Sequence, residues 1–291
     1  MKIVITGSES FIGSELKAHC RARGIECIGL DVLPKQEPGY HQVDIRSTDV
    51  DAVIPENADA LVHLAAISRD QDCRRDLRNA MDVNIGGTIN LIRAAQARKV
   101  KQFVFASSEW IYGNVQPGVV QTEDDPVDIT KMTSEYAMTK IVGERLLFVA
   151  HQRGLCPVTV LRFGIVYGPR PTPMSAVEGI FNEVRTLDTI EIKGSLSSGR
   201  RFVHVSDIAD GVLSALGRSG YEIFNLSGNQ VMTFGEIIKQ SANILNRHPQ
   251  VVETDPKAIN LRNPDNQKVR RELGWEPRLS LEQGLATLLP S

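Results

Sequence analysis

The stretch that decides the fold is Thr6–Gly13, TGSESFIG, which follows the uninterrupted apolar run Ile3–Ile5. Such a run is typical of a strand in a parallel sheet that helices cover on both faces. Apolar side chains then recur at helical spacing from Phe11 to Cys20, and the pattern stops at Gly24. A glycine turn between a strand and a helix directs backbone N–H groups from the helix N-terminus, where a phosphate can bind.

A carboxylate follows this turn at the distance expected in a dinucleotide-binding unit. Asp31 ends the second apolar strand, Glu26–Asp31, roughly 20 residues beyond the turn. At that place a carboxylate accepts hydrogen bonds from both hydroxyls of an adenosine ribose and repels a 2′-phosphate. A glycine turn alone is weak evidence, because many such turns bind no ligand. Together with Asp31 it predicts a dinucleotide site that prefers NAD to NADP.

Strands and helices alternate through the first half of the chain. Further apolar strands are expected at Ala60–Ala65, Gln102–Ala106 and Val158–Leu161, and amphipathic helices at Val83–Arg98 and Ser134–His151. This alternation predicts an α/β fold with a Rossmann-type, doubly wound, parallel sheet.

The pattern changes after Arg162, where prolines recur and shorter elements replace the regular alternation. We therefore expect a NAD-binding Rossmann domain over residues 1–162 and a smaller C-terminal substrate-binding lobe over residues 163–291. A helical pattern near residues 206–217 is expected to return to the first domain, so the boundary need not be a single cut.

The charge of the chain is nearly balanced, with 33 Lys and Arg against 35 Asp and Glu and a formal net charge of -2. This balance argues against a nucleic acid or an anionic membrane as partner. No apolar stretch approaches the roughly 20 residues of a membrane-spanning helix. The N-terminal apolar run lacks the apolar region of roughly 7–15 residues found in a signal peptide. We therefore expect a cytoplasmic protein.

Metal-binding patterns are missing from the sequence. The four cysteines lie far apart with no C-x-x-C pair, which indicates neither a zinc site nor a disulfide scaffold. The six histidines are scattered, and His63, within an apolar strand, is interpreted as a hydrogen-bonded core residue. We expect no metal.

The segment Tyr136–Lys140, YAMTK, predicts a catalytic pair. Its four-residue spacing puts the phenol and the ammonium on one face of a helix. A nearby ammonium lowers the pKa of a phenol from about 10 toward neutrality, which makes a usable general acid or base. This spacing is common by chance, but here Ser108 also ends an apolar strand, at the edge where ligands bind in open α/β sheets.

Taken together, the glycine turn, Ser108 and the Tyr136/Lys140 pair resemble the extended short-chain dehydrogenase/reductase superfamily, and more narrowly its nucleotide-sugar epimerase/dehydratase branch. Five further segments carry the resemblance: Asp44–Ile45, His63–Ala66, Arg162–Arg170, Gly199–Asp207 and Asn263–Lys268. The resemblance implies a NAD cofactor, a nucleotide-sugar substrate and catalysis by Ser108, Tyr136 and Lys140. Members often dimerise through two crossover helices, which implies a homodimer.

The resemblance also assigns binding residues. The cofactor-binding residues are expected to be Gly7, Ser10, Phe11, Ile12, Gly13, Asp31, Asp44, Ile45, Leu64, Ala65, Ala66, Asn84, Tyr136, Lys140, Ile165 and Val166. The substrate-binding residues are expected to be Ser68, Glu109, Arg170, Arg200 and Asp265. Among these, Arg200 falls at the position of the arginine that binds the substrate diphosphate.

This chain departs from the family pattern at three places that bear on the reaction. Ser10 replaces the middle glycine of the turn, and Gly164 replaces an asparagine that contacts the diphosphate in many epimerases. Trp110 stands where hexose 4,6-dehydratases carry a glutamate, although Glu109 keeps a carboxylate beside Ser108. The loss of that glutamate favours a NAD-dependent nucleotide-sugar epimerase over a dehydratase.

Three alternative functions stay open. A dehydratase would use Glu109 as the base that removes a proton next to the new carbonyl. A 4-keto-sugar reductase is less favoured, because Asp31 argues against the NADPH that such reductases commonly use. A non-catalytic NAD-binding sensor or interaction protein is compatible with the fold, but it would have little reason to keep Ser108, Tyr136 and Lys140 together.

Overall fold

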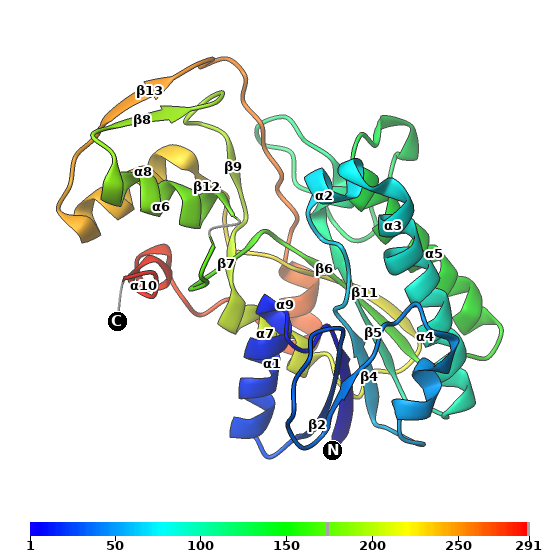
Figure 1. The fold of residues 1–291 in the computed structure, drawn as a ribbon. Coiled ribbons are helices and arrows are strands. Elements are labelled where there is room, and N and C mark those ends of the chain that lie inside the picture. The colour runs from blue at the N-terminus through cyan, green and yellow to red at the C-terminus, as the bar shows by residue number, and fades with distance from the viewer. Residues whose placement is uncertain (173–174, 290–291) are drawn as a thin grey trace. The chain divides into compact units, whose positions relative to one another are not determined.

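A seven-stranded sheet is the main feature of the computed structural model, which describes residues 1–172 and 175–289 (Figure 1). Its strands are β1 (Lys2–Thr6), β2 (Glu26–Asp31), β3 (Tyr40–Gln42), β4 (Ala60–His63), β5 (Phe103–Ser108), β6 (Val158–Phe163) and β11 (Tyr221–Leu226). They lie in the order β3-β2-β1-β4-β5-β6-β11, and the pairs from β3 to β5 are parallel. The predicted Rossmann-type sheet is confirmed, because this order is that of doubly wound dinucleotide-binding folds.

Helices connect these strands. The long ones are α1 (Phe11–Ala22), α4 (Gly87–Ala97) and α5 (Glu135–Gln152), and α7 (Val205–Ser214) precedes β11. In Figure 1, α1 lies on one side of the sheet, and α4 and α5 lie on the other. The shorter helical segments are η1 (Thr48–Val53), α2 (Asp70–Arg75), α3 (Leu77–Met81), η2 (Asp82–Gly86), η3 (Glu109–Tyr112) and η4 (Ile129–Lys131).

The helix predicted over Val83–Arg98 differs from the observed one at its start. Regular α-helix begins only at Gly87, because the preceding turn, η2, widens into a π-helix around the buried Asn84. Single π-turns of this kind occur mostly where a helix serves a functional site.

The chain divides into two compact units. Unit 1 comprises Met1–Ile111, Pro126–Arg162 and Ala209–Phe224, and unit 2 comprises Tyr112–Asp125, Phe163–Ile208 and Asn225–Ser291. This division differs from the expected boundary at residue 162, since Tyr112–Asp125 belongs to unit 2. The reason is that Val115 and Gln121 form β-bridges with Leu261 and Pro264.

Unit 2 contains two long helices, α6 (Ala176–Thr186) and α8 (Phe234–Leu245), and otherwise short elements. The short elements are β7 (Val166–Tyr167), β8 (Thr189–Ile192), β9 (Gly199–Arg200), β10 (Val203–His204), β12 (Met232–Thr233), β13 (Gln250–Glu253), α9 (Gln267–Leu273) and α10 (Leu281–Ala286). The strands pair in twos, β10 with β7, β12 with β9 and β13 with β8.

Each unit has its own apolar core. In unit 1, Phe103 and Phe105 of the sheet pack with Leu91 of α4 and Leu147 of α5. In unit 2, a second cluster gathers Tyr167 with side chains of α6, α8 and α10. Over the described ranges, the search for a helix with the length and hydropathy of a membrane span finds none.

Candidate active site and cofactor site

The glycine turn of unit 1 fits a bound dinucleotide. Gly7 has a φ of 68°, and a Cβ at Gly7 would lie 2.7 Å from the Ala65 nitrogen. A Cβ at Gly13 would lie 2.1 Å from the Gly7 carbonyl oxygen. The backbone at both positions therefore excludes side chains and leaves the start of α1 open to a phosphate.

Ser10, at the position of the middle family glycine, is the N-cap of α1. Its hydroxyl oxygen accepts a hydrogen bond from the Gly13 N–H at 3.1 Å. Serine is a favourable N-cap residue, so the substitution supports the helix start. The hydroxyl hydrogen stays available as a donor to an anion.

Asp31 occupies the end of β2 as predicted, and it also holds the glycine turn. One carboxylate oxygen accepts the Glu9 N–H at 2.9 Å, and the other accepts the Leu33 N–H at 3.2 Å. These bonds fix the carboxylate at the carboxyl edge of the sheet, where an adenosine ribose is expected.

A polar chain crosses the sheet beneath this edge through His63, which is buried. The Thr88 hydroxyl donates to the Asn84 carbonyl at 2.6 Å, so its oxygen is the acceptor for His63 Nε2–H at 3.0 Å. His63 Nδ1 then accepts from the Thr6 hydroxyl at 2.8 Å, and Thr6 accepts the Ala65 N–H at 3.3 Å. Burial lowers the pKa of His63 to about 3, which keeps the ring neutral. His63 is a core residue in this structure.

Asn84 continues this chain to the helix that carries the predicted tyrosine. Its side-chain oxygen accepts the Ile67 N–H at 2.8 Å, and its amide nitrogen donates to the Ile67 carbonyl at 3.0 Å and to Thr139 Oγ1 at 3.0 Å. The Thr139 hydroxyl donates to the Tyr136 carbonyl at 2.8 Å. Asn84 thus ties the loop after β4 to the first turn of α5.

The structure brings Ser108, Tyr136 and Lys140 together within unit 1. Ser108 is the last residue of β5, and Tyr136 lies in the first turn of α5. Desolvation raises the pKa of the Tyr136 phenol above its ordinary value, and a hydrogen bond with Ser108 lowers it. The effect of desolvation is the larger one, so the phenol of this chain alone is protonated at neutral pH.

Lys140 lies one turn after Tyr136 and is 4% exposed. Its ammonium lies 5.0 Å from the centroid of the Phe105 ring and 5.7 Å from that of Tyr136. Burial lowers the pKa of Lys140 to about 8, against the opposing effects of Cys73 and Glu144. The ammonium therefore keeps its charge at neutral pH and is available to attract electron density from the phenol or a ribose hydroxyl.

A buried ion pair lies behind these residues. Glu144, fully buried one turn after Lys140, accepts from Arg162 Nη2 at 2.8 Å and from the Ser107 hydroxyl at 2.5 Å. A buried charge pair of this kind fixes geometry rather than adding much stability. It links α5 to β5 and β6, next to Ser108.

Asp70 is a residue that the sequence analysis missed. Its carboxylate accepts the Ser134 hydroxyl at 2.6 Å and the Tyr136 N–H at 3.2 Å, and Arg74 donates to it at 2.8 Å. Ser134 in turn caps α5 by accepting the Ala137 N–H at 3.0 Å. No local pattern could reveal Asp70, since it lies 64 residues before Ser134.

Glu109 and Trp110 follow Ser108 in η3. Glu109 is fully buried, whereas Trp110 is half-buried. The backbone N–H of Trp110 donates to the Ser108 hydroxyl at 3.3 Å. A carboxylate therefore lies in the interior immediately next to the predicted catalytic serine.

The other predicted residues of unit 1 differ in their exposure. Ile45 is buried and packs against Gly87, while Arg46 donates to the Asp44 carboxylate and lowers its pKa. Leu64 donates its N–H to the Thr6 carbonyl at 3.1 Å. Ser68 is exposed. Phe11, Ile12, Ala65 and Ala66 are half-buried.

In unit 2, Ile165 and Val166 lie half-buried at β7. Arg170, predicted to bind substrate, donates to both oxygens of the buried Glu178, with Nε 2.8 Å from each. This bidentate ion pair gives Arg170 a structural role, and its role in substrate binding stays a prediction. A Cβ at Gly164 would lie 2.7 Å from the Arg201 carbonyl oxygen, which is the steric reason why no asparagine occupies that position.

Arg200 and Asp265 both lie near the segment of residues 260–265 in unit 2. Arg200 donates to the Asn260 carbonyl and side-chain oxygens, both at 2.6 Å. Asp265 lies 3.7 Å from the guanidinium of Arg201. Arg201 and Arg262 were not predicted from the sequence. The backbone N–H of the buried Arg262 donates to the Gly199 carbonyl at 3.4 Å. Arg262 directly precedes the segment Asn263–Lys268, which carries the family resemblance, and this position could have indicated it.

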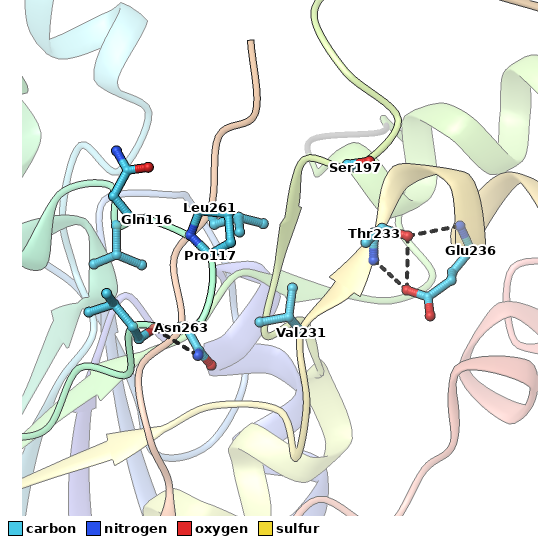
Figure 2. Close-up of a pocket in the computed structure, with 11 residues that line it drawn as sticks. Gln116, Pro117, Ser197, Val231, Thr233, Glu236, Leu261 and Asn263 are labelled. Carbon is cyan, nitrogen blue, oxygen red and sulfur yellow. Dashed lines mark hydrogen bonds between the residues drawn. The ribbon is translucent and has the colours of Figure 1, made fainter. Parts of the chain in front are cut away.

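A groove of about 270 Å³ lies next to these residues within unit 2. Figure 2 shows Pro117, Val231 and Leu261 on its walls and Asn263 at one end. Its remaining lining residues are Val115, Gln116, Gly118, Val119, Ser197, Thr233 and Glu236. The walls are mostly apolar, and their polar groups are amides, hydroxyls and the Glu236 carboxylate, as is typical of small-molecule sites.

Comparison with known proteins identifies the class. The model of the NAD dependent epimerase/dehydratase family matches residues 3–227. A UDP-glucuronate 4-epimerase of Thermodesulfobacterium geofontis (strain OPF15) is 30% identical over 314 residues, 97% of this chain and 93% of that protein.

Two solved structures share the fold. The UDP-glucose 4-epimerase of Thermus thermophilus, in complex with NAD, is 26% identical, with a TM-score of 0.86 over 99% of this chain and 97% of that chain. A double mutant of DesIV, the dTDP-glucose 4,6-dehydratase of Streptomyces venezuelae, solved with NAD bound, is 26% identical, with a TM-score of 0.85 over 99% and 95%.

The fold and the site define an enzyme of the α/β dinucleotide-binding class. More narrowly, the chain belongs to the NAD-dependent epimerase/dehydratase family, and its cofactor is NAD.

Proposed function

We propose that the chain is a NAD-dependent nucleotide-sugar epimerase, in which Ser108, Tyr136 and Lys140 act on a sugar hydroxyl. The observation that carries the proposal is that these three side chains meet at the carboxyl end of β5, with Ser108 hydrogen-bonded to Tyr136. The epimerases among the relatives support the same reaction.

Each of the three residues would have a separate role in the reaction. Tyr136 takes the proton from the hydroxyl that is oxidised and later returns it. Ser108 donates a hydrogen bond to the reacting oxygen, and the Lys140 ammonium favours the ionised phenol. When bound, NAD supplies a reversible hydride acceptor. An epimerase lets the oxidised sugar present its other face before Tyr136 returns the proton, so the product is an isomer.

The NAD contacts follow from the same geometry. Asp31 would accept hydrogen bonds from the ribose hydroxyls, and the Gly7–Gly13 turn would hold the pyrophosphate at the start of α1. The Ser10 hydroxyl can donate to that anion. Asp44 and Ile45 stay proposals for the adenine end, and Ile165 and Val166 for the nicotinamide end.

The buried Glu109 favours one alternative, a dehydratase. That reaction needs a side chain that removes a carbon-bound proton, and Glu109 is the carboxylate next to Ser108. Trp110 supports the epimerase instead, because an indole offers no such base. A dehydratase also appears among the relatives, so the reaction has to be decided by its product.

We assign the nucleotide part of the substrate to unit 2. Arg200, Arg201 and Arg262 supply cations for a diphosphate, and the groove beside β9 has apolar walls for a base or ribose. UDP, the nucleotide named for two of the relatives, is the first candidate.

A homodimer through α4 and α5 is part of the proposal. Ile89 on α4 and Met138, Phe148 and Val149 on α5 are apolar and between 37% and 43% exposed. A dimer through these helices would bury such exposed apolar side chains. Light scattering on the purified protein measures this state, and a monomer at all concentrations would contradict it. The cytoplasmic location expected from the sequence stays a prediction.

The test of the proposed function is a screen of UDP-, dTDP-, GDP- and CDP-sugars with purified protein and NAD, with products analysed by NMR and mass spectrometry. An isomer formed from one of them, and lost in Tyr136→Phe, is the expected result. Absence of any change with all four nucleotide classes, in protein that binds NAD, would favour the non-catalytic alternative.

A further inference from the structure

Four charged side chains form a closed ring next to Asp31. Glu9 comes from the glycine turn, Lys17 from α1, and Lys35 and Glu37 from the loop after β2. The Lys17 ammonium contacts Glu9 and lies 3.2 Å from a Glu37 oxygen. The Lys35 ammonium lies 2.8 Å from Glu9 and 2.9 Å from Glu37. Each ammonium therefore contacts both carboxylates, and the ring carries no net charge.

The ring is joined to the proposed ribose position through a single residue. The Glu9 backbone N–H donates to Asp31 Oδ2 at 2.9 Å, the carboxylate that would hold the adenosine ribose. Tyr40 holds the start of the loop after β2 in place, since its hydroxyl donates to the Leu33 carbonyl. The ring therefore adjoins the Asp31 carboxylate, beside which the 2′-phosphate of a bound NADP would lie.

Half of the ring is shielded from water. The side chains of Glu9 and Lys17 are each 14% exposed, against 37% for Lys35 and 32% for Glu37. Burial raises the pKa of Glu9, but its contacts with Lys17 and Lys35 lower it to a net value below the ordinary one. Lys35 and Lys17 likewise lower the pKa of Glu37. Both carboxylates are therefore ionised at neutral pH and keep the lysines engaged.

We propose that this ring is a second determinant of the preference for NAD, in which Glu9 and Glu37 occupy the two lysines that would otherwise bind the 2′-phosphate of NADP. The proposal rests on the placement of the ribose at Asp31 in the proposed function. Basic side chains beside the ribose are what accommodate a 2′-phosphate in NADP-binding folds. A phosphate monoester carries roughly −1.5 to −2 charges at neutral pH, so a released lysine would attract it strongly.

The test uses binding rather than turnover. Calorimetry gives the dissociation constants of 5′-AMP and of adenosine 2′,5′-bisphosphate, which differ only in the 2′-phosphate. Glu9→Gln keeps the side-chain size and the N–H to Asp31 and gives the ring a net positive charge. We expect the ratio of the two constants to shift by about tenfold toward the bisphosphate, and the ratio cancels any effect of the variant on the part that the two ligands share.

Two variants act as controls. Glu26→Gln removes a carboxylate at the other end of β2, where Glu26 pairs with Lys2 at 3.1 Å, and it should leave the ratio unchanged. Adding Lys17→Ala and Lys35→Ala to Glu9→Gln should abolish the gain. If circular dichroism shows that Glu9→Gln does not fold, Glu37→Gln from the more exposed half of the ring takes its place, with a smaller shift in the same direction.

An unchanged ratio in folded Glu9→Gln, or a gain that survives removal of both lysines, would overturn the role of the ring while leaving the ribose site intact. Failure of the unmodified chain to bind 5′-AMP would overturn the ribose site itself, and the ring proposal with it.

Discussion

The candidate residues of unit 1 and those of unit 2 are held in different ways. In unit 1 a chain of hydrogen bonds runs from Thr6 through His63 and Asn84 to Tyr136, so residues far apart in sequence support one another. In unit 2 the predicted substrate residues Arg170 and Asp265 form ion pairs, with Glu178 and Arg201 respectively.

We interpret this difference as a division of work between the two units. Fixed geometry suits proton transfer, which the hydrogen-bonded residues of unit 1 would carry out. In unit 2, Arg200 donates to the neutral oxygens of Asn260, so a phosphate can join or replace these acceptors. Arg170, by contrast, is held by the buried Glu178 carboxylate.

The largest effect is expected for Tyr136→Phe, which removes the ionisable hydroxyl from the site of unit 1. Turnover should fall by the ~10²–10⁴-fold typical of a general acid or base. Tyr221→Phe is the matched control, since it deletes a hydroxyl that donates to the Glu144 carbonyl at 3.0 Å and is not among the predicted site residues. Steady-state kinetics on the nucleotide sugar found in the screen measures both, and near-normal turnover of Tyr136→Phe would remove the tyrosine from the mechanism.

Cofactor choice should show the next largest effect. The Asp31 carboxylate would face a 2′-phosphate in a partly desolvated site, so NAD should bind on the order of a hundredfold more tightly than NADP. Calorimetry with both cofactors measures the ratio. Equal affinities would mean that Asp31 does not lie against the ribose.

Arg200 and Arg170 give a matched pair in unit 2. Arg200→Gln should weaken UDP binding by roughly tenfold to a hundredfold, since a hydrogen bond to a charged group contributes about 1.5–3 kcal/mol. Arg170→Gln should instead lower the thermal unfolding temperature, because it leaves the buried Glu178 carboxylate without its forked partner. If Arg170→Gln weakens UDP binding more than Arg200→Gln does, the assignment of the two arginines has to be reversed.

The sequence predicted the features that depend on local spacing. Strands and helices show in the periodicity of apolar residues, and the four-residue spacing of Tyr136 and Lys140 places both on one helix face. The bonds made by Asp70 and by Glu178 could not be predicted, because the partners meet only after the chain has folded. The expectation that the pKa of Tyr136 lies near neutrality also left out desolvation, which raises that pKa in the structure.

The smallest effect concerns stability in acid and arises from His63. Its folded pKa of about 3 lies below the ordinary value of 6.5, so only the unfolded chain takes up a proton between these values. The contribution of neutral His63 to the free energy of unfolding is therefore complete above pH 6.5 and is lost as the pH falls toward 3. Urea unfolding should show a loss of about 2 kcal/mol from this group between pH 7 and pH 5. In His63→Gln this part of the loss should be absent; an equal loss in both proteins would speak against a neutral buried ring.

In the proposed reaction the site of unit 1 oxidises and reduces the sugar without removing a carbon-bound proton. This is tested by running the reaction of the identified nucleotide sugar in D₂O, followed by mass spectrometry and NMR of the product. We expect an isomer of unchanged mass with no deuterium on carbon, and only a modest loss of rate in Glu109→Gln. A product lighter by one water, carrying deuterium and abolished by Glu109→Gln, would contradict it and make Glu109 the base of a dehydratase.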